Sequence, residues 1–204
     1  MSLEELVYSI VAALFAISIH ELAHGAVADR LGDPTPRALG RLTLNPLKHL
    51  DPIGVIMLVL FKVGWAKPVQ INPLYFKDRR RDVILVALAG PFANLTVACI
   101  ISFLGNFLYY LPFHVQFLNA LAYVMAININ INIILAAFNL IPLPPLDGSR
   151  IIANLLPLKI RIAYERIAPY APLILILGIW TGLLRYAINP IVSFLGWIVN
   201  GFSI

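Results

Sequence analysis

Two histidines and a glutamate stand together near residue 20 in a spacing suited to metal chemistry. The segment reads His20-Glu21-Leu22-Ala23-His24. Residues at i and i+4 share one face of a helix, so both imidazoles can reach a single metal ion. The intervening Glu21 can hold and deprotonate a metal-bound water. The pattern therefore predicts a zinc hydrolase with His20 and His24 as metal ligands and Glu21 as the catalytic base.

The helix that must carry these residues is apolar. Residues 6–28 form a 23-residue run without proline, which is enough to cross a hydrocarbon core of about 30 Å. A charged side chain at the bilayer centre costs roughly 2.5–3.5 kcal/mol on insertion scales. The alternative is a pair of buried histidines bonded to neighbouring helices beside a neutralised Glu21. The apolar span favours the metal site over that alternative.

A catalytic zinc needs a third protein ligand and an open position for water. The candidates are His49, His114, Cys99 and the acidic residues. Asp147 is favoured because it lies in the proline-rich, non-helical segment 139–148, where a carboxylate is costly unless it is coordinated. The alternative is that Asp147 caps the helix that follows. Spacing alone does not decide between these two roles.

The composition is that of an integral membrane protein. Of the 204 residues, 60% are hydrophobic and 12% are charged, whereas soluble domains have about 45–50% and about 25%. We expect a single transmembrane domain over residues 1–204, with an all-α, polytopic fold. Lys and Arg lie beside apolar spans without interleaved aromatic residues, which argues against nucleic acid as a partner. Cys99 is the only cysteine, and we expect it to be a buried, inert thiol.

Three apolar segments are expected to form the helical transmembrane core, at residues 6–28, 83–108 and 113–138. The conserved-looking core of the domain is expected at about residues 6–156, ending in a short helix at 149–156. Two more apolar segments follow at about 170–204, separated by Arg185 and Pro190. They are expected to form a hairpin, a bent span with an interfacial helix, or two tilted helices.

The loop between the first two spans, residues 29–82, is the most polar stretch. Within it, Arg41–Leu44 and Val69–Ile71 alternate between polar and apolar residues, which predicts a few short β-strands. The apolar run Val55–Phe61 is too short to span a membrane as a helix. It predicts a strand or a segment that dips into the membrane.

Basic residues set the expected orientation in the membrane. The loop that contains Arg79, Arg80 and Arg81 is rich in Lys and Arg and is predicted to be cytoplasmic. The first span then runs from outside to inside, so both candidate metal segments lie toward the cytoplasmic side. The three arginines themselves are interpreted as an anchor at anionic head groups.

The order of these motifs resembles the site-2 protease family of intramembrane zinc metalloproteases. The resemblance rests first on His20–His24 in an apolar helix and on Asn139–Gly148 after a later span. Three other segments agree with it: Gly40–Pro46, Gly64–Val69 and Ala89–Asn94. It covers about residues 10–156. One departure is Ser149, where many members have a second glycine.

The resemblance implies the roles of five residues. In that family two histidines and an aspartate bind zinc, which corresponds to His20, His24 and Asp147, and the glutamate is the catalytic base, which is Glu21. The asparagine that opens the Asn-x-x-Pro segment is thought to hold the substrate carbonyl or oxyanion, and here it is Asn139.

The 204-residue chain lacks room for the PDZ or CBS domains that many members carry, so we expect a compact member. We expect one Zn²⁺ per chain and a transmembrane protein as substrate. We expect the protein to lie in the lipid bilayer of the cell membrane of a prokaryote. The alternative is a metal-binding membrane protein without catalysis, such as a divalent-metal carrier. The sequence leaves the oligomeric state open.

Four polar residues near these motifs carry weaker expectations. We expect His49 to brace its own loop through a hydrogen bond or, as the alternative, to meet the substrate. Asn94, Asn128 and Asn132 lie within apolar spans, and we expect them to hold helices together by hydrogen bonds.

Overall fold

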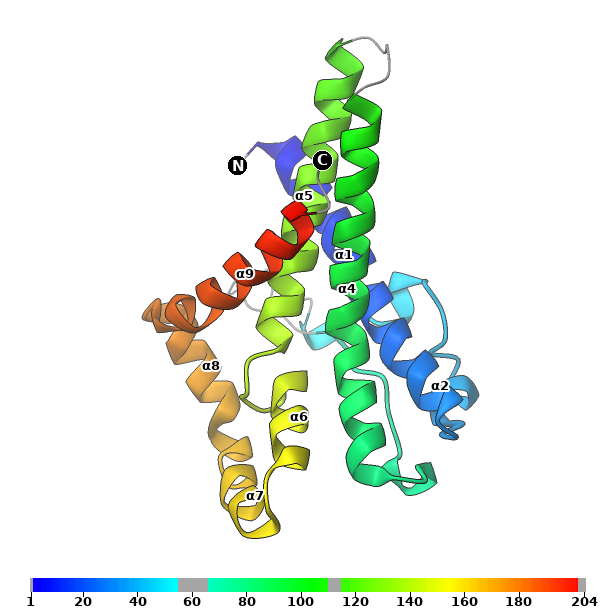
Figure 1. The fold of residues 1–204 in the computed structure, drawn as a ribbon, viewed down its shortest axis with the longest axis vertical. Coiled ribbons are helices and arrows are strands. Elements are labelled where there is room, and N and C mark those ends of the chain that lie inside the picture. Colours follow the sequence, from blue (N-terminus) through cyan, green and yellow to red (C-terminus); the bar gives the residue numbers. More distant parts are fainter. Residues whose placement is uncertain (1, 55–65, 110–114, 202–204) are drawn as a thin grey trace.

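The chain folds as a set of long helices whose apolar lengths suit a membrane (Figure 1). The computed structural model describes residues 2–54, 66–109 and 115–201. Within these residues, four helical stretches are long and apolar enough to cross a membrane: Leu3–Arg30, Arg79–Leu108, Asn119–Asn139 and Leu158–Trp180. The expectation of a helical, polytopic membrane protein is confirmed, and the first three stretches coincide with the three expected spans.

The described elements are long helices and short helical turns. In chain order they are α1 (Leu3–Arg30), α2 (Thr35–Ala38), η1 (Pro46–Lys48), η2 (Pro73–Tyr75), α4 (Arg79–Tyr109), α5 (Val115–Asn139), α6 (Asp147–Leu155), α7 (Leu158–Glu165), η3 (Ala168–Tyr170), α8 (Ala171–Trp180) and α9 (Leu183–Gly201). Helix α6 confirms the short helix expected at 149–156, but it begins two residues earlier, at Asp147, so the non-helical segment is 140–146 and not 139–148.

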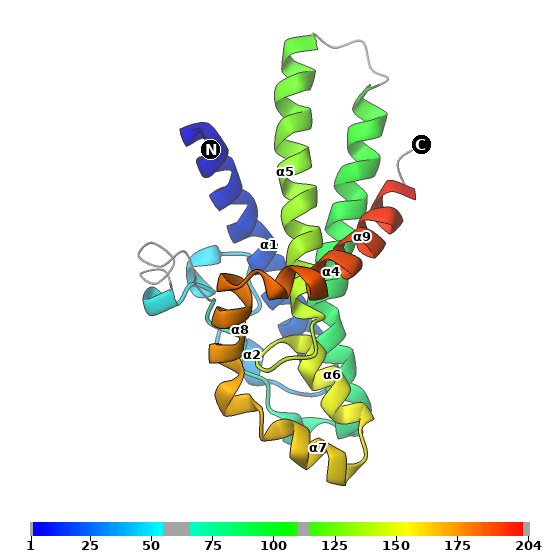
Figure 2. The same cartoon turned by 90° about the vertical axis from the view of Figure 1, so that its left-hand side faces the viewer.

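Helices α1, α4 and α5 pack against one another and form the centre of the molecule. Figure 1 shows α4 and α5 running together along the long axis, with α9 crossing beside them and α6 and α7 near their lower end. In Figure 2, α1 leans away from α5 toward its own N-terminus. The lower half of α1 is therefore the part enclosed by its neighbours.

Small residues let these helices approach closely. The main core cluster combines residues of α4, α5 and α9: Ala98, Ile133, Ala136, Ala137, Leu195 and Val199. Close packing of small side chains is the usual way in which helices associate in lipid, where the hydrophobic effect does not drive them together. The core thus fixes α4 against α5, and both of these helices support the site described below.

The start and end of α1 follow from local sequence. Ser2 and Glu5 form a capping box in which the Ser2 hydroxyl accepts from the Glu5 amide and the Glu5 carboxylate accepts from the Ser2 amide. The helix ends before Gly32, whose φ of 107° lies in the left-handed region. His20 and His24 lie in the C-terminal half of this continuous helix.

The expected short strands are not present among the described residues. The backbone amide of Val69 donates to the Glu21 carboxylate, and that of Asn72 donates to the Asp33 carboxylate. These amides are therefore not available to pair with a neighbouring strand. Arg41–Leu44 instead contains a tight turn, because the Thr43 amide donates to the Arg41 carbonyl. An isolated antiparallel bridge joins Leu50 and Ala66. The run Val55–Phe61 lies outside the described residues.

The two C-terminal apolar segments are α8 and α9, and the break between them was expected at Arg185 and Pro190. Arg185 and Pro190 both lie inside α9 and do not separate two segments. The break falls at Gly182, whose φ of 76° ends α8 and lets the chain turn into α9. This part of the chain is two helices, with α8 completing the stretch Leu158–Trp180.

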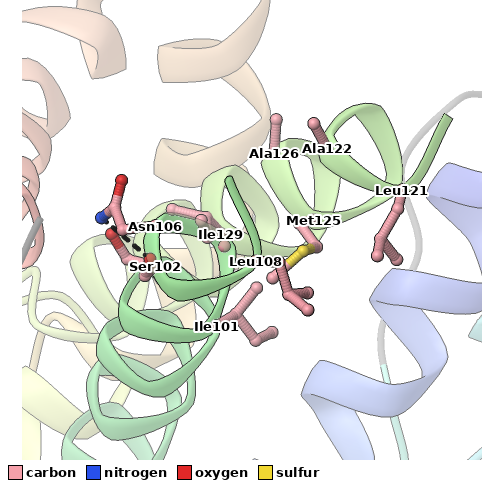
Figure 3. Close-up of a pocket in the computed structure, with 10 residues that line it drawn as sticks. Ile101, Ser102, Asn106, Leu108, Leu121, Ala122, Met125, Ala126 and Ile129 are labelled. Carbon is pink, nitrogen blue, oxygen red and sulfur yellow. Dashed lines mark hydrogen bonds between the residues drawn. The ribbon is translucent and has the colours of Figure 1, made fainter. Parts of the chain in front are cut away.

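Figure 3 shows a pocket of about 310 Å³ between α4 and α5. Met125 of α5 reaches toward Leu108 and Ile101 of α4, and at one edge the Asn106 amide donates to the backbone carbonyl of Ser102. No candidate site residue lines this pocket. It is an apolar gap between two spans.

Candidate metal centre

The structure brings His20, His24 and Asp147 together. Oδ2 of Asp147 lies 3.1 Å from Nε2 of His20 and 3.0 Å from Nε2 of His24, and the two Nε2 atoms are 3.0 Å apart. All three residues are buried, with exposed fractions of 5–7%. His20 and Asp147 are 127 positions apart in the chain, and their ligand atoms converge with that of His24 on one point.

The outer ring nitrogens of both histidines are engaged by α4. His24 Nδ1 lies 2.7 Å from the Val86 carbonyl, which can only accept, so this nitrogen carries a proton. His20 Nδ1 lies 2.7 Å from Oδ1 of Asn94 and carries a proton for the same reason. Neutral rings with Nδ1–H leave a lone pair on each Nε2. The point of convergence is therefore surrounded by two lone pairs and a carboxylate, and a cation satisfies them all.

The spacing of these atoms fits zinc. Bonds of about 2.0–2.1 Å in a tetrahedral shell place neighbouring ligand atoms about 3.3–3.4 Å apart. The observed separations of 3.0–3.1 Å differ from this by a few tenths of an ångström. Carboxylate oxygen is also a usual zinc ligand, and Oδ2 of Asp147 is the atom that faces both imidazoles. The third ligand is thus a carboxylate.

Asp147 reaches the histidines because the backbone before it turns sharply. After α5 ends at Asn139, the segment 140–146 turns back, and the Tyr164 hydroxyl of α7 donates to its Pro142 carbonyl. The residue that caps α6 is Leu146, without a side-chain capping bond. The alternative role of Asp147 as a helix cap is therefore wrong.

Gly148 allows this close turn. A Cβ at Gly148 would lie 2.2 Å from the Leu140 carbonyl oxygen and 2.6 Å from that of Ile141, both of which are backbone atoms. Only glycine fits there without moving the backbone that presents Asp147. Ser149, the departure from the family pattern, bonds the Leu146 carbonyl through its hydroxyl and touches no ligand.

One face of α4 supports both histidines. Val86, Gly90 and Asn94 are spaced by four residues and so lie on the same face of that helix. Val86 and Asn94 bond the two rings, and between them a Cβ at Gly90 would lie 2.5 Å from His24 Nε2 and 2.6 Å from His20 Nε2. The sequence analysis missed these roles for Gly90 and Asn94. Their i, i+4 spacing was the available signal.

Glu21 lies between the two histidines on α1 but engages a different element. Its Oε2 accepts from the Val69 amide at 2.8 Å. Val69 is buried, and its side chain packs close to Gly25, one turn further along α1. The polar loop after α1 therefore folds back onto the glutamate. Within the described part of the chain, Oε1 of Glu21 has no hydrogen-bond partner.

Asn139 forms its side-chain hydrogen bond within its own helix. It is the last residue of α5, and its side-chain amide donates to the Leu135 carbonyl of the same helix at 3.0 Å. No hydrogen bond joins it to the other site residues in the described structure. Its expected role at the substrate carbonyl stays a prediction.

The other candidate ligands do not join the cluster. His49 is fully buried, and its Nε2 donates to the Thr43 carbonyl at 2.9 Å, so it braces its own loop. Cys99 is a free cysteine that packs at the edge of the α4–α5–α9 core. His114 lies outside the described residues. Asp147 is thus the residue that the described structure offers as third ligand.

An apolar pocket of about 430 Å³ lies beside the face of α4 that holds the histidines. Ala89 and Pro91, the neighbours of Gly90, both line it, as does Leu140 at the start of the turn that leads to Asp147. The site is therefore flanked by apolar space on this side.

Comparison with known proteins places the chain in a family. Residues 8–179 match the model of peptidase family M50. The chain is 38% identical over 192 residues to "Putative zinc metalloprotease YwhC" of Bacillus subtilis, covering 91% of this chain and 86% of that protein. It is 31% identical over 141 residues to "Putative zinc metalloprotease Rip2" of Mycolicibacterium smegmatis, covering 66% of this chain and 52% of that protein. No solved structure matches. The chain therefore belongs to peptidase family M50, the site-2 protease family, and this membership supports its assignment as a zinc metalloprotease.

Proposed function

We propose that the chain is an intramembrane zinc metalloprotease that hydrolyses a peptide bond within or near a transmembrane segment of another membrane protein. The observation that carries this proposal is the buried cluster of His20, His24 and Asp147, with Glu21 beside it, among helices apolar enough to cross a membrane. A soluble substrate would have to cross apolar surface to reach such a site. A membrane-embedded one is already there.

The residues divide the chemistry between them. His20, His24 and Asp147 would hold one zinc per chain, and zinc, when bound, polarises a carbonyl and lowers the pKa of its water toward about 7. Glu21 takes the proton of the attacking water and delivers it to the leaving amine. Its Oε2 is held by the Val69 amide, which leaves Oε1 to accept that proton.

Asn139 is proposed as the group that donates to the developing oxyanion. Its amide is bonded to Leu135 in the structure, so this role requires a rotation of the side chain toward the bound substrate. Loss of one such donor typically costs about 10²–10³-fold in rate. A helical substrate also hides its own amides in i to i−4 hydrogen bonds, so it must unwind locally before it can be cleaved.

The decisive experiment compares wild type with Glu21→Gln at matched zinc occupancy, in liposomes, against a panel of single-span substrates. Gln still reaches the Val69 amide with its carbonyl oxygen but cannot take up the proton. Cleavage should fall by about 10²–10⁴-fold while zinc content and fold stay unchanged. Equal cleavage by both proteins would remove Glu21 from the mechanism. Cleavage by neither protein across the panel would favour the metal-binding alternative without catalysis.

The proposed setting is the cell membrane of a prokaryote, with the site toward the cytoplasm. The segment Lys67–Asp82 is then cytoplasmic, because short loops rich in Lys and Arg stay inside. In a Cys99→Ala background, a cysteine at Asn72 should escape an impermeant thiol reagent in intact cells, and one at Ser2 should react with it. Reaction at position 72 but not at position 2 would invert the orientation.

A further inference from the structure

A chain of two buried asparagines links α5 to the metal cluster through α4. Asn94 of α4 and Asn132 of α5 are each 0% exposed. The Asn94 amide nitrogen donates to Oδ1 of Asn132 at 2.8 Å and to the Ala16 carbonyl of α1 at 3.0 Å, while its Oδ1 meets His20 Nδ1 at 2.7 Å. Every polar atom of the Asn94 side chain is therefore used, and it touches all three central helices.

Two backbone carbonyls fix the orientation of both amides. The Asn132 nitrogen donates to the Asn128 carbonyl at 2.9 Å, and a carbonyl can only accept, so Oδ1 of Asn132 must face Asn94. The Asn94 nitrogen must then face Asn132 and the Ala16 carbonyl. Oδ1 of Asn94 is left to face His20. A reversed Asn94 would set its Oδ1 against two acceptors, Oδ1 of Asn132 and the Ala16 carbonyl.

This orientation selects one tautomer of His20. Oδ1 of Asn94 has no proton to give, so the proton between the two residues belongs to Nδ1 of His20. Nε2 then keeps the lone pair that faces Asp147 and His24. His20 is buried and its Nδ1 meets Oδ1 of Asn94 directly, so a protein group and not solvent contacts this nitrogen. The protein therefore selects the tautomer with its own groups.

We propose that Asn94 and Asn132 are positioning residues, which hold His20 in the tautomer and orientation needed to bind the metal. This inference rests on the metal site of the proposed function. It differs from helix packing, the role expected of both residues from the sequence, because it assigns them a direct effect on metal affinity. Groups that orient a metal-binding histidine typically change metal affinity about 10–100-fold when they are lost.

The chain supplies a matched control at Asn128. Its side-chain amide donates to the Val124 carbonyl one turn back along α5, at 2.9 Å. That bond has the same form as the one from Asn132 to Asn128, but the Asn128 side chain makes no hydrogen bond to Asn94 in the described structure. Asn128→Leu leaves the Asn128 carbonyl in place. It therefore reports the cost of removing a partly buried polar side chain from α5 without removing the hydrogen bonds that lead to His20.

The test measures the zinc affinity of the full-length protein in detergent, by competition with a chromophoric chelator. Asn94→Leu and Asn132→Leu should each lower the affinity about 10–100-fold, and Asn128→Leu should stay within about twofold of wild type. Asn132→Asp keeps an oxygen acceptor for Asn94, so it should recover most of the affinity that Asn132→Leu loses. His20→Ala provides the reference for a broken site.

The outcomes separate this inference from the function on which it rests. If His20→Ala binds zinc like wild type, the proposed metal site is wrong. If His20→Ala loses zinc but both Leu variants match Asn128→Leu, the metal site stands and the positioning role is refuted. Should the Leu variants fail to fold, ¹⁵N-histidine NMR of the zinc-free wild type decides. A proton on His20 Nδ1 that exchanges slowly with water is expected, and an unprotonated Nδ1 would refute the inference.

Discussion

Gly90→Ala adds one methyl group at the point where α4 faces the two ligand nitrogens. The new Cβ would lie 2.5 Å from His24 Nε2 and 2.6 Å from His20 Nε2. Non-bonded heavy atoms prefer about 3.5–4.0 Å, so α4 and the histidines must separate by about 1 Å. The rings cannot simply rotate away, because their Nδ1 atoms are bonded to Val86 and Asn94 of the same helix.

A displacement of this size exceeds what a zinc bond allows. Zinc–nitrogen bonds are about 2.0–2.1 Å long, and a 1 Å misplacement of catalytic groups costs about 10²-fold in rate. We expect Gly90→Ala to lower zinc affinity by at least about 100-fold, beyond the usual range for groups that only orient a ligand. Peptidase activity should fall by at least about 10²-fold at subsaturating zinc.

The assay is zinc content after dialysis against a weak chelator, measured by mass spectrometry for variants of equal monodispersity. Gly196→Ala in α9 is the matched control, since a Cβ there meets nothing within 4 Å. Gly105→Ala is a second control, for the effect of a glycine-to-alanine change within α4. A Cβ at Gly105 would meet only the flexible end of the Met125 side chain, at 3.3 Å. Full zinc retention in Gly90→Ala, at the level of both controls, would refute the placement of α4 against the two Nε2 atoms.

Three further predictions concern the elements around the site. Gly148→Ala should lose zinc as Gly90→Ala does, because its Cβ would overlap the Leu140 carbonyl and move Asp147; zinc content checks this, and normal content would show that the turn can relax. Arg80 donates to the carbonyls of Asn154 and Leu156 at the end of α6, so Arg80→Met should cost about 1 kcal/mol, or about 2–4 °C in melting temperature. An equal loss of melting temperature in Arg79→Met would show that the loss comes from removing a positive charge and not from the bonds to α6. Removing zinc with a strong chelator should lower the melting temperature of wild type and leave that of His20→Ala unchanged; an equal shift in both would place the stabilising metal elsewhere.

The sequence was sufficient to predict the parts of this fold that depend on local pattern. The three spans, the short helix α6 and the pairing of His20 with His24 follow from hydrophobic length and from i, i+4 spacing. Asp147 was the favoured third ligand, but a helix cap was equally compatible with its spacing. The structure excludes the cap because Leu146 holds that position.

The sequence was insufficient where a residue's role depends on a partner far along the chain. Val69–Ile71 has the alternation of a strand, but its amide donor is taken by Glu21, which lies 48 residues earlier. Gly90 and Asn94 look like ordinary packing residues until α4 is set against α1. Arg80, interpreted as a membrane anchor, also bonds the end of α6. Tertiary contacts of this kind override local pattern.

The central claim is that two imidazoles and one carboxylate of this chain form a zinc site. X-ray absorption at the zinc K-edge of the purified wild-type protein, with zinc quantified per chain, tests it most directly. We predict about one zinc per chain with two imidazole rings and oxygen as its nearest neighbours, at about 2.0–2.2 Å, and no sulfur. A sulfur neighbour at about 2.3 Å, which only Cys99 or a methionine could supply, or a shell without two imidazoles, would contradict the assignment of His20, His24 and Asp147.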